Sequence, residues 1–182
     1  VVLPMSSSEP DTSFYYAKKQ FVERGFEHVV NFNFNKETTH TSWIDSLKHA
    51  RLIYISGGDQ NRFMDIVLNT EIHKAIKAAY MSGATIAGTS AGAAVMSKKM
   101  ITGDEYKHPE YTGEFRTIEA KNIEIAEGLG LLEHCIVDQH FIWRMRMNRL
   151  ITTSLENPGY ACIGIDESTA IIVHGDSARV VG

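Results

Sequence analysis

Residues 84–96 read Ala-Thr-Ile-Ala-Gly-Thr-Ser-Ala-Gly-Ala-Ala-Val-Met, and this stretch decides the fold. The apolar run 84–87 predicts a short buried strand, and residues 91–96 predict the start of a helix. Gly88, Ser90 and Gly92 between them form the pattern G-x-S-x-G. A serine on a tight strand-to-helix turn is strained and exposed, and nearby N–H groups can receive an oxyanion. A plain small-residue turn is the simpler interpretation, but the flanking strand and helix favour a nucleophile.

Strands and helices alternate along the rest of the chain. We expect strands at 1–3, 28–32, 51–55, 135–138, 160–165, 169–173 and 179–181, helices at 11–24, 41–49, 61–80 and 143–156, and a long polar loop at 101–122. Such alternation predicts an α/β fold with a parallel sheet covered on both faces. We predict one domain over residues 1–182, and its strand-like first and last residues lead us to expect that terminal segments are missing.

Composition narrows the classes of function. The chain has 182 residues with 18 basic and 22 acidic side chains, a net charge of −4, which predicts no general affinity for nucleic acid. No apolar run is long enough to cross a membrane. Cys135 and Cys162 lie in apolar runs, so we expect reduced, buried thiols. No signal peptide is visible, which favours a cytoplasmic location; secretion is the alternative if an N-terminal segment is missing.

Polar clusters follow four of the predicted strands. These are Gly57-Gly58-Asp59-Gln60, Ser90, Asp138-Gln139-His140 and Asp166-Glu167-Ser168. Ligands of open α/β sheets bind outside the carboxyl ends of the strands. If the four strands are parallel, a nucleophile, an imidazole and a carboxylate therefore share one site.

A general base and an acid are expected beside Ser90. His140 is one of eight histidines and is favoured as the base by its position at a strand end. Glu167 is the first choice for the residue that orients the imidazole, and Glu105 is the second. Asp138 could line a pocket or orient His140, since alternation along a strand would put both on one face.

Backbone N–H groups and arginines complete the candidate site. Gly58 and Ala91 are the expected oxyanion donors, although the Gly57-Gly58 pair also suits an ordinary turn. Arg144, Arg146 and Arg149 can meet one ligand only if the segment after His140 is not yet helical. Clustered guanidinium groups favour a carboxylate ligand, and a solvated helix face is the alternative. No zinc motif, dinucleotide fingerprint or P-loop is present, so we expect neither metal nor cofactor.

The chain resembles the cyanophycinases and their relative dipeptidase E. The resemblance rests on the joint order and spacing of Leu3-Pro4-Met5-Ser6-Ser7-Ser8-Glu9-Pro10, Gly57-Gly58-Asp59-Gln60, Gly88-Thr89-Ser90-Ala91-Gly92-Ala93, Val137-Asp138-Gln139-His140-Phe141, Arg144-x-Arg146-x-x-Arg149-Leu150 and Gly164-Ile165-Asp166-Glu167-Ser168-Thr169-Ala170. It implies a three-layer sandwich with a mostly parallel, flavodoxin-like sheet, as in class I glutamine amidotransferases.

The resemblance also implies an activity. A member would be a serine exopeptidase that cleaves cyanophycin, a polyaspartate carrying arginine on its side chains, into β-Asp-Arg dipeptides. Ser90 would be the nucleophile, His140 the base and Glu167 the acid, with Glu105 near the acid of dipeptidase E. Residues matching the substrate pocket are Gln60, Asp138, Gln139, Arg144, Arg146 and Arg149. Cleavage of short α-aspartyl dipeptides and a non-catalytic binding role are the alternatives, and family members often form homodimers.

Overall fold

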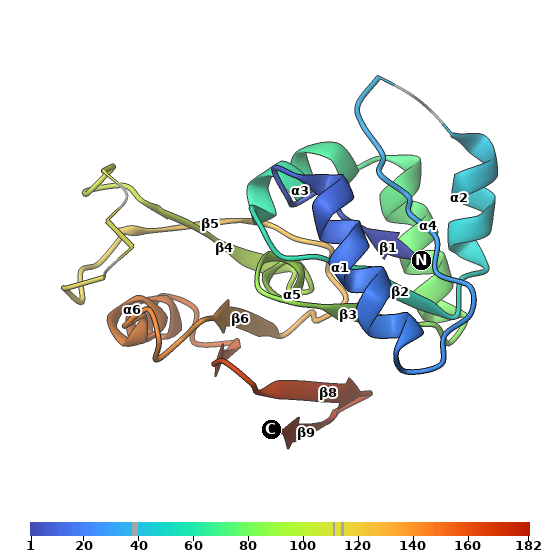
Figure 1. Cartoon of the computed structure of the whole chain (residues 1–182). Helices are drawn as coiled ribbons and strands as arrows, with labels where there is room; N and C mark the ends of the chain where they lie inside the picture. Colours follow the sequence, from blue (N-terminus) through green and yellow to red (C-terminus); the bar gives the residue numbers. More distant parts are fainter. Residues whose placement is uncertain (38–39, 111, 114) are drawn as a thin grey trace.

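A computed structural model describes residues 1–37, 40–110, 112–113 and 115–182 (Figure 1). The helices are α1 (Pro10–Val22), α2 (Thr41–Lys48), α3 (Gln60–Val67), α4 (Glu71–Met81), α5 (Ala91–Ala94) and α6 (Met147–Glu156). The strands are β1 (Val2–Leu3), β2 (Leu52–Ile55), β3 (Thr85–Gly88), β4 (Lys99–Glu105), β5 (Ile123–Glu127), β6 (Cys135–Gln139), β7 (Ala161–Ile165), β8 (Ala170–His174) and β9 (Ser177–Val181).

A three-stranded parallel sheet, in the order β1-β2-β3, carries the first polar clusters. Alternation along β2 sends Ile53 and Ile55 into the main core, where they are fully buried with residues of α2, α3 and α4. Tyr54 points to the opposite face and meets Phe21 of α1 edge-on at 5.3 Å. Helices therefore cover both faces of this sheet, as Figure 1 shows.

The second half of the chain is built from three strand pairs. β6 and β7 pair in parallel, whereas β4–β5 and β8–β9 are antiparallel. A second small core joins Ile101, Phe115, Ile123 and Ile136. The β4–β5 hairpin projects from the molecule beside α6, and β8–β9 lies along its lower edge in Figure 1.

Three sequence predictions need correction. Residues 28–32 form no strand but a single parallel bridge between Val2 and Asn31. The expected helix over 61–80 is two helices, because Leu68 leaves the helical conformation with ψ 131° and Asn69 is left-handed with φ 60°. The helix predicted from 143 begins only at Met147.

The predicted loop over 101–122 is also wrong in its first part. Residues 101–105 belong to β4, which pairs with β5 from Lys99–Glu127 to Glu105–Ile123 with a register shift between Ile101 and Glu105. Met100, Ile101 and Thr102 are buried in succession, so the strand lacks the alternation of a half-buried strand, and its glycine and charged residues favoured a loop in the sequence. Residues 111 and 114 lie outside the described part.

The two parallel groups are not joined in the described part of the chain, where β3 and β6 belong to separate sheets. A cavity of about 750 Å³ lies beside them, lined by β3, the ends of β6 and β7, and the β8–β9 hairpin. The prediction of a mixed α/β fold with parallel strands is confirmed, and the polar ends of β3, β6 and β7 open onto this cavity.

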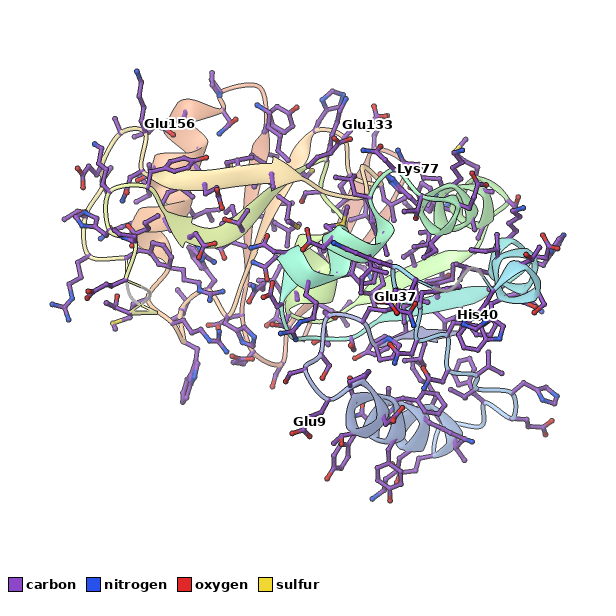
Figure 2. The ribbon with its side chains drawn as sticks, turned by 90° about the horizontal axis from the view of Figure 1, so that it is seen from above. Glu9, Glu37, His40, Lys77, Glu133 and Glu156 are labelled. Carbon is purple, nitrogen blue, oxygen red and sulfur yellow. The ribbon has the colours of Figure 1, made fainter. Side chains whose placement is uncertain are left out.

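Many charged side chains lie on the outside of the molecule. Figure 2 shows Glu9, Lys77, Glu133 and Glu156 directed away from the ribbon, and all four are exposed. No helix within the described ranges is long and apolar enough to cross a membrane. Both cysteines are free thiols, and each is half-buried.

Candidate active site

Ser90 lies on a sharp turn between β3 and α5. Its backbone has φ 53° and ψ −115°, a conformation that is strained for any residue with a side chain. The two glycines of the motif make the turn possible. A Cβ on Gly88 would lie 2.1 Å from the carbonyl oxygen of Gly92, and one on Gly92 would lie 2.2 Å from that of Ile55. The glycines therefore let α5 pack directly on the sheet and lift Ser90 to the cavity.

A chain of hydrogen bonds runs from Ser90 through His140 to Glu167. The Nε2 atom of His140 lies 2.8 Å from Ser90 Oγ, and its Nδ1 lies 2.5 Å from Glu167 Oε1. Neutral imidazole carries one proton, so a carboxylate at Nδ1 holds that proton there and leaves Nε2 as the acceptor for the serine hydroxyl. This is the arrangement of a serine nucleophile with its base and orienting acid.

Glu105, the second choice for the orienting acid, has a different partner. Its Oε1 accepts a hydrogen bond of 2.5 Å from Asn122 across the β4–β5 hairpin. Glu167 comes from the turn after β7, immediately beside the strand that carries His140. The parallel pairing of β6 and β7 brings the imidazole and this carboxylate together.

The Gly57-Gly58 turn at the end of β2 approaches Ser90. A Cβ on Gly57 would lie 3.3 Å from Ser90 Cβ, and one on Gly58 would lie 2.2 Å from the carbonyl oxygen of Ser6. The backbone of Gly58 has φ 138°, which favours glycine. Within the described residues, the N–H groups of Gly58 and Ala91 make no hydrogen bond. They therefore remain available to a ligand near Ser90.

Ser6 holds the glycine turn and was missed by the sequence analysis as a positioning residue. Its carbonyl accepts the N–H of Asp59 at 2.8 Å, and its hydroxyl donates to the carbonyl of Ser56 at 2.7 Å. The side chain of Asp59 then caps α3 by accepting from the N–H groups of Asn61 and Arg62. A serine-rich segment after a predicted strand was the only signal in the sequence.

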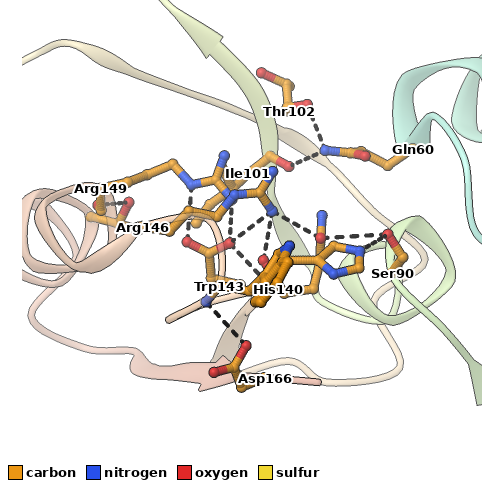
Figure 3. Close-up of polar contacts among 12 residues, drawn as sticks. Gln60, Ser90, Ile101, Thr102, His140, Trp143, Arg146, Arg149 and Asp166 are labelled. Carbon is orange, nitrogen blue, oxygen red and sulfur yellow. Dashed lines mark hydrogen bonds and ion pairs between the residues drawn. The ribbon is translucent and has the colours of Figure 1, made fainter. Parts of the chain in front are cut away.

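His140 lies on a second strained turn, with φ 52°. The next residue, Phe141, packs its ring where a Cβ on Gly164 would lie, only 2.5 Å from the ring carbon Cγ. The N–H of Trp143 then donates to Asp166 Oδ1 at 3.3 Å (Figure 3). The turn after β6 is thus attached to the same β7 end that supplies Glu167, a contact that local sequence patterns did not reveal.

The three arginines occupy two environments. Arg146 and Arg149 are buried, whereas Arg144 is exposed. Arg149 makes a bidentate ion pair with Asp138, in which Nε donates to Oδ2 at 2.9 Å and a second nitrogen donates to Oδ1. Arg146 lies 3.7 Å from the same Oδ1 (Figure 3). The segment after His140 is not helical, as a shared ligand for all three arginines would require, but Arg144 is exposed while Arg146 and Arg149 lie against Asp138.

The two glutamines are also held by protein partners. Arg146 donates to the Gln139 carbonyl at 2.5 Å and to its Oε1 at 2.8 Å, and Ser90 Oγ lies 3.5 Å from that Oε1. Gln60 is buried, and its Nε2 donates to the carbonyls of Ile101 and Thr102 in β4 (Figure 3). Within the described ranges, no group of three or more His, Cys, Asp or Glu side chains is placed to hold a metal ion.

Comparison with known proteins identifies the family. The model of peptidase family S51 matches residues 1–181. The chain belongs to peptidase family S51. A cyanophycinase of Nostoc sp. is 35% identical over 178 residues, 96% of this chain and 57% of its own length. A cyanophycinase of Geminocystis herdmanii is 31% identical over 185 residues, 100% of this chain and 65% of the relative.

Solved structures agree with this S51 assignment. A peptidase from an acI-B1 Actinobacterium superposes with a TM-score of 0.72 at 26% identity, covering 100% of this chain and 72% of that one. A candidate peptidase E from Listeria monocytogenes shares the fold with a TM-score of 0.66 at 20% identity, covering 84% of its own chain. The resemblance to cyanophycinases predicted from the motifs is confirmed. The S51 chain spans little more than half the length of the Nostoc relative.

Proposed function

We propose that this S51 protein is a serine exopeptidase that hydrolyses cyanophycin to β-Asp-Arg dipeptides. The observation that carries the proposal is the continuous hydrogen-bond chain Ser90–His140–Glu167, with links of 2.8 and 2.5 Å, on the wall of a large cavity. Similarity to cyanophycinases supplies the substrate class.

The first step is attack of Ser90 Oγ on the carbonyl carbon of the scissile bond. His140 Nε2 takes the hydroxyl proton as the new C–O bond forms, and Glu167 stabilises the resulting imidazolium. The carbonyl oxygen becomes an oxyanion, which accepts hydrogen bonds from the N–H groups of Gly58 and Ala91. Preorganised donors of this kind supply several kcal/mol of transition-state stabilisation, about 3 each.

The second step releases the products. The tetrahedral intermediate collapses when its C–N bond breaks, and His140 passes its proton to the leaving amine. An acyl group then remains on Ser90. Water attacks this ester with His140 again as base, and Ser90 recovers its proton when the acid product leaves.

Substrate recognition is assigned to the charged groups around this centre. The six predicted binding residues are Gln60, Asp138, Gln139, Arg144, Arg146 and Arg149. Among these, the guanidinium of Arg144 is exposed and makes no hydrogen bond with the described residues, so it is free to pair with a carboxylate of an aspartyl backbone. Glu167 and Asp166 border the cavity and present negative charge to an arginyl side chain.

Ser90→Ala tests the proposal directly. Wild type and variant are incubated with insoluble cyanophycin, and soluble products are followed by mass spectrometry. We expect β-Asp-Arg from the wild type and a loss of about 10⁴-fold or more in the variant, because the nucleophile is gone while the fold is untouched. Equal dipeptide release by both proteins would contradict the mechanism.

Short α-aspartyl dipeptides are assayed in parallel, because the Listeria structure shares this fold. Cleavage of these dipeptides without cleavage of cyanophycin would replace the polymer substrate by a dipeptide one. A chain that cleaves neither substrate and resists a serine-directed fluorophosphonate would instead be a non-catalytic binding protein.

We also propose that the strands belong to a flavodoxin-like, three-layer peptidase domain, as the resemblance implies. The parallel order β1-β2-β3 with helices on both faces supports it. A homodimer is a further proposal, which analytical ultracentrifugation would test.

A further inference from the structure

We propose that Arg146 is a positioning residue, which fixes the Gln139 carboxamide so that an acceptor and not a donor faces Ser90 Oγ. The inference rests on the proposed function, because it takes Ser90 as the nucleophile. It gives Arg146 a role different from the substrate binding expected from its place in the motif.

The orientation of the Gln139 side chain follows from the chemistry of its neighbour. Arg146 is 3% exposed, and one of its nitrogens lies 2.8 Å from the end of the Gln139 carboxamide. A guanidinium offers only donors, so the amide atom that it meets must be the oxygen. The amide nitrogen is therefore turned away from Arg146. Ser90 Oγ lies 3.5 Å from that same oxygen.

This orientation matters for the nucleophile. The hydroxyl proton of Ser90 goes to His140 Nε2, which at 2.8 Å is a much closer acceptor than the Gln139 oxygen. The lone pairs of Oγ are then free to attack. If the carboxamide were flipped, its NH₂ would face Oγ and donate to a lone pair that the attack requires. Arg146 opposes that flip by holding the oxygen.

A buried ion-pair cluster holds Arg146 in turn. Asp138 Oδ1 lies 3.7 Å from Arg146 and accepts the N–H of Gln139 at 2.8 Å. Arg149 donates hydrogen bonds to the same carboxylate through two nitrogens. Its guanidinium carbon lies 4.5 Å from the centre of the Phe115 ring. The side chains of Asp138, Arg146 and Arg149 are at most 3% exposed. Close packing on all sides leaves the guanidinium of Arg146 little freedom to move.

The test is a double-substitution cycle read by the rate at which a fluorophosphonate labels Ser90, which does not depend on the natural substrate. Arg146→Met is expected to slow labelling about tenfold, the effect of one neutral hydrogen bond to Ser90 Oγ that must break before the attack. Gln139→Met removes both the acceptor and the donor, so it is expected to cost about threefold or less. The double variant should label at the rate of Gln139→Met alone, because no amide remains to flip.

Three controls keep the outcome decisive. Arg51→Met removes an exposed arginine just before β2 and should label at the wild-type rate. Thermal unfolding reports whether each variant is folded. If Arg146→Met does not fold, Arg146→Lys takes its place, because the lysine ammonium retains the charge but lacks the planar guanidinium. Labelling of Ser90 should then slow about threefold. This slowing should again be absent when Gln139 is methionine.

The inference is overturned if Arg146 variants label at the wild-type rate, or if their slowing persists undiminished when Gln139 is methionine. Either result would leave the proposed function standing. A wild-type protein that is not labelled at all would instead contradict the proposed function.

Discussion

Asp138 and His140 lie two residues apart at the end of β6, and their surroundings are opposite. The Asp138 side chain is fully buried between two arginines, whereas that of His140 is 21% exposed and faces Ser90 and Glu167 at the cavity. An extended strand would place both on one face, but His140 has φ 52° and leaves the strand geometry. The end of β6 therefore places the His140 imidazole at the cavity and the Asp138 carboxylate in a buried ion-pair cluster.

The same difference in exposure separates the Ser90–His140–Glu167 chain from the cluster of Asp138, Arg146 and Arg149. The residues of the proposed triad, Ser90, His140 and Glu167, meet solvent, and Glu167 is 49% exposed. The side chains of Asp138, Arg146 and Arg149 are buried away from water. Each charge in this cluster is therefore stabilised mainly by its ion-pair partners. Changes in the triad should lower activity while leaving stability nearly intact, whereas changes in the cluster should lower stability. The following variants test that division.

Glu167→Gln should lower kcat by about a hundredfold, because an amide can no longer hold the imidazole tautomer that receives the serine proton. Glu105→Gln is the matched control and should change kcat less than about threefold, since Glu105 bonds Asn122 instead. Initial rates of dipeptide release give both numbers. A larger loss in Glu105→Gln would exchange the roles of the two acids.

Asp138→Ala should lower the free energy of unfolding by about 3 kcal/mol, because two buried arginines lose their shared carboxylate. The exposed Asp176, in the turn between β8 and β9, is the control, and its replacement by Ala should change stability by less than about 0.5 kcal/mol. Urea denaturation measures both. Equal stability of the two variants would show that the cluster is not structural.

Arg144→Met should raise KM for cyanophycin about tenfold with little change in kcat, since one charge-assisted hydrogen bond to substrate is worth about 1.5 kcal/mol. Its thermal unfolding temperature should match the wild type, unlike that of Asp138→Ala. An unchanged KM would remove Arg144 from substrate binding.

The thiol of Cys162 on β7 gives a pH-dependent measure of burial near Asp138, with a smaller expected effect than the variants above. Burial raises the pKa of this thiol, and the negative charge of Asp138 adds to the shift. A raised pKa leaves less reactive thiolate at any pH below it. At pH 8, iodoacetamide should therefore label Cys162 roughly several-fold faster in the denatured protein than in the native protein. Peptide mapping measures the rate, and equal rates would mean that the thiol is not shielded.

Local patterns in the sequence were sufficient to predict the strand before Ser90, the turn at Ser90 and the helix after it. The apolar run before Ser90 and the small residues after it predict the turn, and the structure shows why both glycines are needed. The polar ends of β2, β3, β6 and β7 were predicted to converge, because parallel strands end at one edge. This much depends on residues close together in the chain.

The remaining features depend on partners far apart in the sequence. Glu167 contacts His140, 27 positions away, because β6 and β7 pair in parallel. Glu105 instead contacts Asn122, 17 positions away. Neither contact can be predicted from local sequence patterns. Burial of Arg146 and Arg149 required α6 to begin at Met147, later than periodicity predicted. The split of the 61–80 helix depended on the backbone conformations of Leu68 and Asn69, which periodicity does not detect.

Mass-spectrometric mapping of a fluorophosphonate adduct tests the central claim most directly. We expect one adduct in the wild type, on the peptide that contains Ser90. In His140→Ala the rate of its formation should fall about 10³-fold, because the base is missing. His28→Ala, an exposed histidine outside the site, should label normally. An adduct on another serine, or equal labelling of Ser90 without His140, would contradict a Ser90–His140–Glu167 catalytic centre.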